Sequence, residues 1–328
     1  MGAMTHEEFL ELRERLRTSR PGLIDCAQLN VYRSLAARFP AIAPSEHKEA
    51  PYRCHLAERF LAHLQLPAEW KSRTHVTHGV RRSLAALFQV FARDGVRVAI
   101  PADVYPVYVQ LARDSGVRFT TFTKFPSELE ACDAVLFCEP AKPWGSTLNA
   151  DQLARLLAWS RAKRGLVLLD SAYATPPTSG AMQLVHEGAA MLLASLSKGW
   201  LIPDHGGICI TPPGEWFERT RATFTALPKD AQKLRIAFAA LTEHAQRPTQ
   251  VGEALSARAR VLDELTTMRP ELNTTRVQGY FAVSTRSFDE LLGLGVLGVP
   301  ASVFGSTERL TILSSLEPER ISGLQLQS

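Results

Sequence analysis

Short apolar runs that alternate with amphipathic segments constrain the fold of this chain more than any other feature. Strands are expected at residues 97–100, 118–122, 134–138 and 167–170, and helices at residues 80–93, 106–115 and 151–163. Parallel strands need a long crossover connection, usually a helix, so this alternation predicts a mostly parallel sheet. The predicted fold class is therefore α/β, with a central sheet flanked by helices and active residues at the carboxyl ends of its strands.

The two ends of the chain predict a second, smaller α/β unit. After Pro270 a strand is expected at 277–284, a helix at 288–294 and a strand at 309–314. Further helices are expected at 50–64 and at 5–17, where Thr5 and Glu8 have the spacing of a capping box. We therefore divide the chain into an N-terminal segment that contributes to the small domain (1–48), a large domain (49–268) and a small C-terminal domain (269–328).

The composition is that of an ordinary globular protein. The chain has 328 residues, of which 45% are hydrophobic, so it can bury a large core. The net charge of +4 comes from 37 basic and 33 acidic residues scattered along the chain, which does not indicate a nucleic-acid surface. Five cysteines without metal-like spacing favour reduced thiols in a cytoplasm and no metal site, and no segment has the length of a membrane span.

Two of the buried strands end in residues that carry chemistry. The apolar run 189–194 leads into Ser195, Leu196, Ser197 and Lys198, and the run 165–169 leads into Asp170, Ser171, Ala172 and Tyr173. An ammonium at the end of a buried strand is costly to desolvate, which lowers its pKa and favours a nucleophilic amine. Taken singly, such an aspartate is more often a helix cap and such a lysine more often reaches solvent. Together, the acid, the phenol and the amine predict a pyridoxal phosphate site.

Pyridoxal phosphate gives each of these residue types a role. Its ring accepts electrons from an amino acid only while the pyridine nitrogen stays protonated, and a carboxylate such as Asp170 holds the proton there. Tyr173 would act near the phenolic oxygen, and Lys198 would carry the cofactor as a Schiff base and move the Cα proton. The predicted catalytic residues are therefore Lys198, Asp170 and Tyr173.

The order of these motifs resembles the fold-type I pyridoxal-phosphate enzymes, specifically the class I/II aminotransferase-like family, over residues 79–315. Residues 170–173 resemble the family's Asp-x-Ala-Tyr, and residues 195–198 resemble its Ser-x-Ser-Lys. The resemblance implies an aspartate-aminotransferase-like large domain that binds the cofactor, a homodimer, and amino acid and keto acid substrates.

Further residues resemble the family's cofactor-binding positions. The turn into the helix at residue 80 is similar to the family's turn, in which the first amides of the helix hold the cofactor's phosphate. The hydroxyls of two serines follow the apolar run 189–194. The phosphate-binding candidates are His78, Gly79, Val80, Arg81, Ser195 and Ser197. A lone glycine is more often an ordinary turn, and serines at strand ends often satisfy only backbone groups.

Three other positions complete the resemblance. Tyr105 matches the aromatic residue that stacks on the cofactor ring, with a core or turn tyrosine as the competing interpretation. Tyr52 matches the tyrosine that crosses a dimer interface to the phosphate. Arg309 matches the arginine that binds the substrate's α-carboxylate through two parallel hydrogen bonds, against the alternative of a surface arginine at a strand start.

The chain departs from the family at two places. The family's Asn-Pro-x-Asn-Pro-Thr-Gly is replaced here by residues 139–145, Glu-Pro-Ala-Lys-Pro-Trp-Gly. Lys142 thereby stands where the second asparagine contacts the cofactor's phenolic oxygen and the substrate carboxylate. No arginine follows Lys198 to bind the phosphate, so His205 is the nearest replacement and Arg81 the alternative.

These features predict a pyridoxal-phosphate enzyme acting on an amino acid, with transamination as the first candidate. The departures keep open other reactions on the same scaffold: elimination, replacement or cyclisation, decarboxylation and racemisation. A non-catalytic binding or regulatory protein is the remaining class. The substrate is not identified by the sequence.

Overall fold

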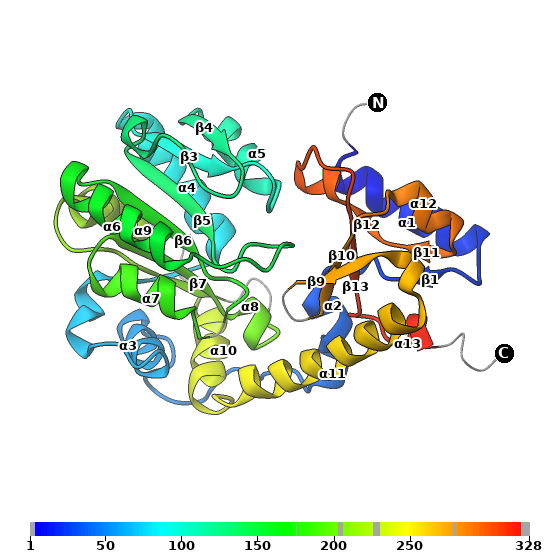
Figure 1. Cartoon of the computed structure of the whole chain (residues 1–328). Coiled ribbons are helices and arrows are strands. Elements are labelled where there is room, and N and C mark those ends of the chain that lie inside the picture. The colour runs from blue at the N-terminus through cyan, green and yellow to red at the C-terminus, as the bar shows by residue number, and fades with distance from the viewer. Residues whose placement is uncertain (1–3, 175, 203–205, 226–229, 278–279, 323–328) are drawn as a thin grey trace.

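The central sheet of the computed structural model has seven strands, in the order β2-β8-β7-β6-β5-β3-β4 (Figure 1). The structure describes residues 4–174, 176–202, 206–225, 230–277 and 280–322. The strands are β2 (Thr74–Thr77), β3 (Arg97–Pro101), β4 (Arg118–Phe122), β5 (Ala134–Cys138), β6 (Leu166–Asp170), β7 (Ala190–Ser195) and β8 (Gly207–Ile210). β8 runs antiparallel to both of its neighbours, β2 and β7, and the other described strand pairs of this sheet are parallel. The mostly parallel sheet predicted from the alternation is confirmed.

Helices cover both faces of this sheet, which explains the apolar runs in its middle strands. Every residue of β5, β6 and β7 is buried, as expected for strands covered on both sides. One face carries α4 (Val80–Arg93), α5 (Val107–Ser115) and α9 (Glu215–Thr225). The other carries α3 (Arg53–His63), α6 (Ala150–Lys163), α7 (Ser179–His186) and α10 (Ala231–Thr242). Alternate strand residues therefore enter two separate hydrophobic clusters.

A second layer forms around a four-stranded antiparallel sheet of order β12-β13-β10-β9. Its strands are β9 (Thr274–Arg276), β10 (Phe281–Ser284), β12 (Val299–Pro300) and β13 (Thr311–Ser314), and β1 (Ile24–Asp25) pairs separately with β11 (Val296–Leu297). The surrounding helices are α1 (His6–Ser19), α2 (Val31–Leu35), α12 (Phe288–Gly293) and α13 (Glu319–Ser322). The strand expected at 277–284 is observed as β10, which begins at Phe281 and pairs with β9 just before the expected range, and the strand expected at 309–314 begins at Thr311.

The N-terminal segment packs with the C-terminal strands, in the half of the molecule that holds both termini (Figure 1). Thr5 and Glu8 form the predicted capping box of α1. Arg13 on that helix reaches the buried carboxylate of Asp25, with an N–O distance of 2.9 Å. The three-part division of the chain stays a prediction.

The long helix α11 (Arg247–Met268) connects the two halves (Figure 1). Its buried residues Val251, Leu262 and Leu265 join the hydrophobic clusters of the smaller half. Short elements complete the chain: α8 (Leu196–Gly199) and the 3-10 turns Ala36–Arg38, Ala68–Arg73, Leu129–Ala131, Pro270–Leu272 and Ala301–Phe304.

Two further findings concern membrane-spanning helices and metal binding. No helix in the described ranges is both long and apolar enough to pass through a bilayer. Within those same ranges, no group of three or more histidine, cysteine or acidic residues is placed to bind a metal ion. All five cysteines are free thiols, and only Cys54 among them is exposed.

Candidate active site

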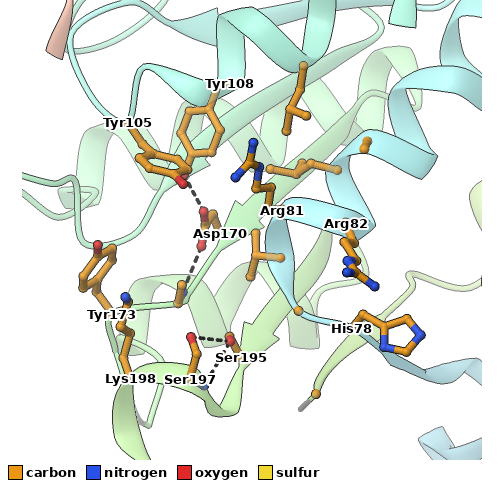
Figure 2. Close-up of a pocket in the computed structure, with 17 residues that line it drawn as sticks. His78, Arg81, Arg82, Tyr105, Tyr108, Asp170, Tyr173, Ser195, Ser197 and Lys198 are labelled. Atoms are coloured by element: carbon orange, nitrogen blue, oxygen red, sulfur yellow. Dashed lines mark hydrogen bonds between the residues drawn. The ribbon is translucent and has the colours of Figure 1, made fainter. Parts of the chain in front are cut away.

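A cavity of about 530 Å³ opens where β6 and β7 end and α4 begins. Figure 2 shows Lys198 and Tyr173 on one side of it, Asp170 and Arg81 in the middle, and His78 and Arg82 on the other side. The cavity brings together ten of the residues predicted from the sequence: His78, Gly79, Val80, Arg81, Tyr105, Asp170, Tyr173, Ser195, Ser197 and Lys198.

Asp170 is the last residue of β6, and its carboxylate is held by two donors. The Tyr108 hydroxyl donates to Oδ2 at 2.5 Å, and the Ala172 amide donates to Oδ1 at 2.9 Å. Burial raises the pKa of Asp170, and both donors oppose that rise because they favour the charged form. The carboxylate is therefore fixed in position for a cationic partner in the cavity.

Lys198 follows β7 by three residues and lies in the short helix α8. Burial lowers the pKa of its ammonium, and the nearby Asp170 charge partly opposes the shift. Its Nζ lies 5.4 Å from the centre of the Tyr173 ring. A lysine with a lowered pKa at a cavity end is the state that a nucleophilic amine requires.

Tyr105 and Tyr108 project from the start of α5 and the turn before it. Their rings meet edge to face, with centres 5.3 Å apart. Burial raises the pKa of both phenols, so both are neutral donors at ordinary pH. Tyr108 was not among the residues predicted, although it lies only three residues after Tyr105.

The phosphate-binding candidates gather at the start of α4. Gly79 precedes that helix with φ of 99°, a left-handed conformation that favours glycine. Gly207 of β8 packs against it so closely that a Cβ there would lie 2.9 Å from the Gly79 Cα and 2.3 Å from the Ala194 carbonyl oxygen. The chain thus brings a helix N-terminus next to the loop after β7, a geometry suited to an anion.

Two hydroxyls at the end of β7 and two arginines of α4 line the same cavity. The Ser195 hydroxyl donates to Ser197 Oγ at 2.8 Å and accepts from the Ser197 amide at 3.1 Å. The side chains of Arg81 and Arg82 also line the cavity, and Arg82 was missed by the sequence reasoning. Its signal was present, because Arg82 lies in the first turn of the predicted helix.

Three other predicted residues, Tyr52, Arg309 and Lys142, are not part of the cavity wall. Tyr52 immediately precedes α3 and is 58% exposed. Arg309 is exposed, two residues before β13. Lys142 is buried near Tyr173, with its Nζ 4.9 Å from the centre of that ring. His205 lies outside the described residues.

Comparison with known proteins identifies a family and a shared fold. The family described as aminotransferase class I and II matches residues 41–304, most of the chain. An LL-diaminopimelate aminotransferase of Desulforapulum autotrophicum is 29% identical over 115 residues. That match covers 30% of this chain and 28% of the relative, so it spans well under half of either protein.

Solved structures match over almost the whole chain. An LL-diaminopimelate aminotransferase from Chlamydomonas reinhardtii superposes with a TM-score of 0.72 at 16% identity, covering 98% of this chain and 94% of that one. A Thermus thermophilus aspartate aminotransferase mutant gives a TM-score of 0.70 at 19% identity, covering 98% and 95%. At these identities the likeness establishes the fold, and it confirms the predicted architecture.

Proposed function

Because the chain belongs to the aminotransferase class I and II family, we propose that it is a pyridoxal-phosphate-dependent aminotransferase that exchanges an amino group between an amino acid and a keto acid. The observation that carries the proposal is one cavity holding Lys198, Asp170 and Tyr173 together. An amine, an acid and a phenol in that arrangement match the three polar positions of the cofactor ring.

The residues present fit the cofactor at both ends. The phosphate would bind at the start of α4, on the amides after Gly79 and the Ser195 hydroxyl, with Arg81 and Arg82 supplying positive charge. The ring nitrogen would meet the carboxylate of Asp170, which is buried and already held by two donors. The phosphate site thus needs no arginine after Lys198.

Each side chain then has a defined task. The bound cofactor supplies the aldehyde that links to an amine and the ring that accepts electrons from Cα. Lys198 would hold the cofactor until the substrate amine displaces it, and its free Nζ would then accept the proton from the substrate Cα and later return a proton. Asp170 keeps the proton on the ring nitrogen, and the Tyr173 hydroxyl donates toward the phenolic oxygen. Tyr105 would cover the ring face.

A second candidate is a lyase, replacement, cyclisation, decarboxylation or racemisation reaction in the same cavity. The observation that favours it is Lys142, a buried amine in the position where the family has asparagine. A group that orients the substrate decides which bond to Cα is broken, so this change bears on the reaction type.

A single-turnover experiment separates these candidates. Holoprotein would be mixed with individual amino acids, and its visible spectrum and the keto acid released would be followed. We expect one amino acid to convert the cofactor to its pyridoxamine form with one equivalent of keto acid. Return of the starting spectrum after each turnover, without an amino acceptor, would contradict transamination. A protein that never takes up the cofactor would contradict the enzyme assignment.

We also propose a homodimer in a reducing compartment such as the cytoplasm. The 58% exposure of the Tyr52 side chain supports a partner subunit covering it, and the five unpaired thiols support a reducing environment. Sedimentation analysis checks the first point, and a monomer at micromolar concentration would contradict it. Thiol titration of protein prepared without reductant checks the second, because fewer than five free thiols would count against it.

A further inference from the structure

A second cavity, of about 450 Å³, lies at the carboxyl ends of β3, β4 and β5 and is walled by the loop 139–149 that follows β5. The described residues that line it have no member in common with those that line the catalytic cavity. Even neighbours in the chain divide between the two, because Val104 lines the second cavity and Tyr105 lines the catalytic one. The second cavity is therefore a separate space.

Both halves of the molecule contribute to the second cavity. The large half supplies the strand ends and the loop 139–149. The small half supplies Val283 of β10 and, from the segment before β13, Ser306, Glu308 and Leu310. A ligand bound here would contact both halves.

Aromatic rings form much of the apolar wall of the second cavity. Phe122 and Phe137 line it together, with ring centres 5.5 Å apart. Trp144 lines it from the loop, and its indole N–H donates to the carbonyl oxygen of Asp103 at 2.5 Å. Such walls suit an apolar ligand body, and ring faces also attract cations.

Glu139 places a buried carboxylate in the lining of the second cavity. The residue is 2% exposed, and its carboxylate accepts from the Thr178 hydroxyl at 2.9 Å and from the Leu148 amide at 3.1 Å. Both donors are neutral, and no ion pair in the described part of the chain involves Glu139. The family has asparagine at this position, and the proposed function gives the change no role. A buried carboxylate without a cation is costly, so this charge favours a cationic ligand.

Two further carboxylates line the second cavity, one from each half. Asp103 is half-buried and Glu308 is exposed. Burial raises the pKa of Asp103 and the Glu308 charge raises it further, while Lys124 opposes the shift, so these charges lie close enough to interact. Lys124 is the one basic side chain among the described lining residues. Three carboxylates against one ammonium leave the lining with an excess of negative charge.

We propose that the second cavity binds an organic ammonium ion that carries an apolar body. The carboxylates of the lining balance the charge of this ligand, and the aromatic wall covers its apolar body. A neutral ligand of the same shape leaves the excess negative charge unbalanced, and an anion adds to it. Because the ligand contacts both halves, its binding stabilises their present arrangement. The inference goes beyond the proposed function and does not rest on it, since the second cavity shares no lining residue with the catalytic one.

The test uses benzyltrimethylammonium, which has no N–H and therefore forms no imine with the cofactor. Calorimetry at neutral pH measures its affinity for holoprotein and for apoprotein. We expect a Kd of about 1 mM or lower, equal in the two forms. Benzyl alcohol, which has the aromatic ring without the charge, should bind about tenfold or more weakly.

Two variants test the carboxylates. Glu139→Gln keeps an acceptor for the Thr178 hydroxyl and removes the charge, so the probe should bind about tenfold or more weakly. Glu308→Lys reverses the charge of an exposed side chain, which should weaken binding about fivefold or more. The matched control is Glu253→Lys, the same change at an exposed glutamate of α11, and it should bind the probe as wild type does.

Several results would overturn the inference. They are failure of wild-type protein to bind benzyltrimethylammonium, equal binding of benzyl alcohol, and wild-type affinity in Glu139→Gln or Glu308→Lys. Loss of binding when the cofactor is loaded would also overturn it, because the probe would then occupy the catalytic cavity. If Glu139→Gln does not fold, the comparison of Glu308→Lys with Glu253→Lys still decides. Failure of the proposed function is recognised separately, because a protein that takes up no cofactor should still bind the probe.

Discussion

Replacing Tyr108 with phenylalanine removes one hydroxyl from the support of Asp170 and leaves the buried ring in place. Tyr108 and Asp170 are 1% and 5% exposed, and the hydroxyl lies 2.5 Å from Oδ2 of Asp170. A hydrogen bond to a charged group contributes about 1.5–3 kcal/mol. Asp170 keeps its second donor, the Ala172 amide. Because the lost bond favours the carboxylate that pairs with the cofactor's ring nitrogen, we expect pyridoxal phosphate to bind about tenfold or more weakly.

The same substitution should move the acid limb of the pH–rate profile. Burial raises the pKa of Asp170 and the Tyr108 hydroxyl lowers it, so Tyr108→Phe raises that pKa further. Asp170 then takes up a proton at a higher pH, and activity is lost earlier as the pH falls. Cofactor titration by absorbance and single-turnover rates from pH 5 to 8 measure both effects. The control is Tyr32→Phe, the same chemical change in α2. Unchanged cofactor affinity together with an unmoved acid limb would refute the reasoning.

Two further substitutions test the packing around the site and the attachment of the N-terminal helix. Gly207→Ala places a methyl group 2.9 Å from the Gly79 Cα. Urea unfolding should therefore show a free energy of unfolding lower by about 1–3 kcal/mol, and the cofactor should bind more weakly. The control is Gly252→Ala, where a Cβ would have nothing within 4 Å, and it should change neither the stability nor the cofactor affinity. Arg13→Met leaves the buried Asp25 carboxylate without its main partner, so the apoprotein should lose about 3 kcal/mol or more. Loss of less than about 1 kcal/mol in either test variant would contradict the geometry.

Most of the large half could be predicted because its signals are local. The buried strands β5, β6 and β7 are continuous apolar runs, and the helices between them have clear periodicity and caps. The residues that follow β6 and β7 come together because neighbouring parallel strands end at one edge of a sheet. The prediction that Asp170 and Lys198 belong to one site therefore needed only the placement of both residues at the carboxyl ends of strands in a mostly parallel sheet.

Long-range contacts account for what the sequence did not predict. The edge strand β2 and its neighbour β8 are short, and they are strands because β2 pairs with β8 and β8 pairs with β7. The bond from Tyr108 to Asp170 joins residues 62 positions apart and depends on how α5 packs on the sheet. The aromatic surroundings of Lys142 combine a loop of the large half with β10 of the small half. No local pattern in the sequence reports such a meeting.

The central claim is that Lys198 carries the cofactor through its amine. The most direct measurement is peptide mass spectrometry of holoprotein reduced with borohydride, alongside Lys198→Ala treated in the same way. The account predicts a pyridoxyl adduct on the peptide containing Lys198, and neither adduct nor appreciable turnover in the variant. An adduct on another lysine, or none in wild-type protein, would contradict it.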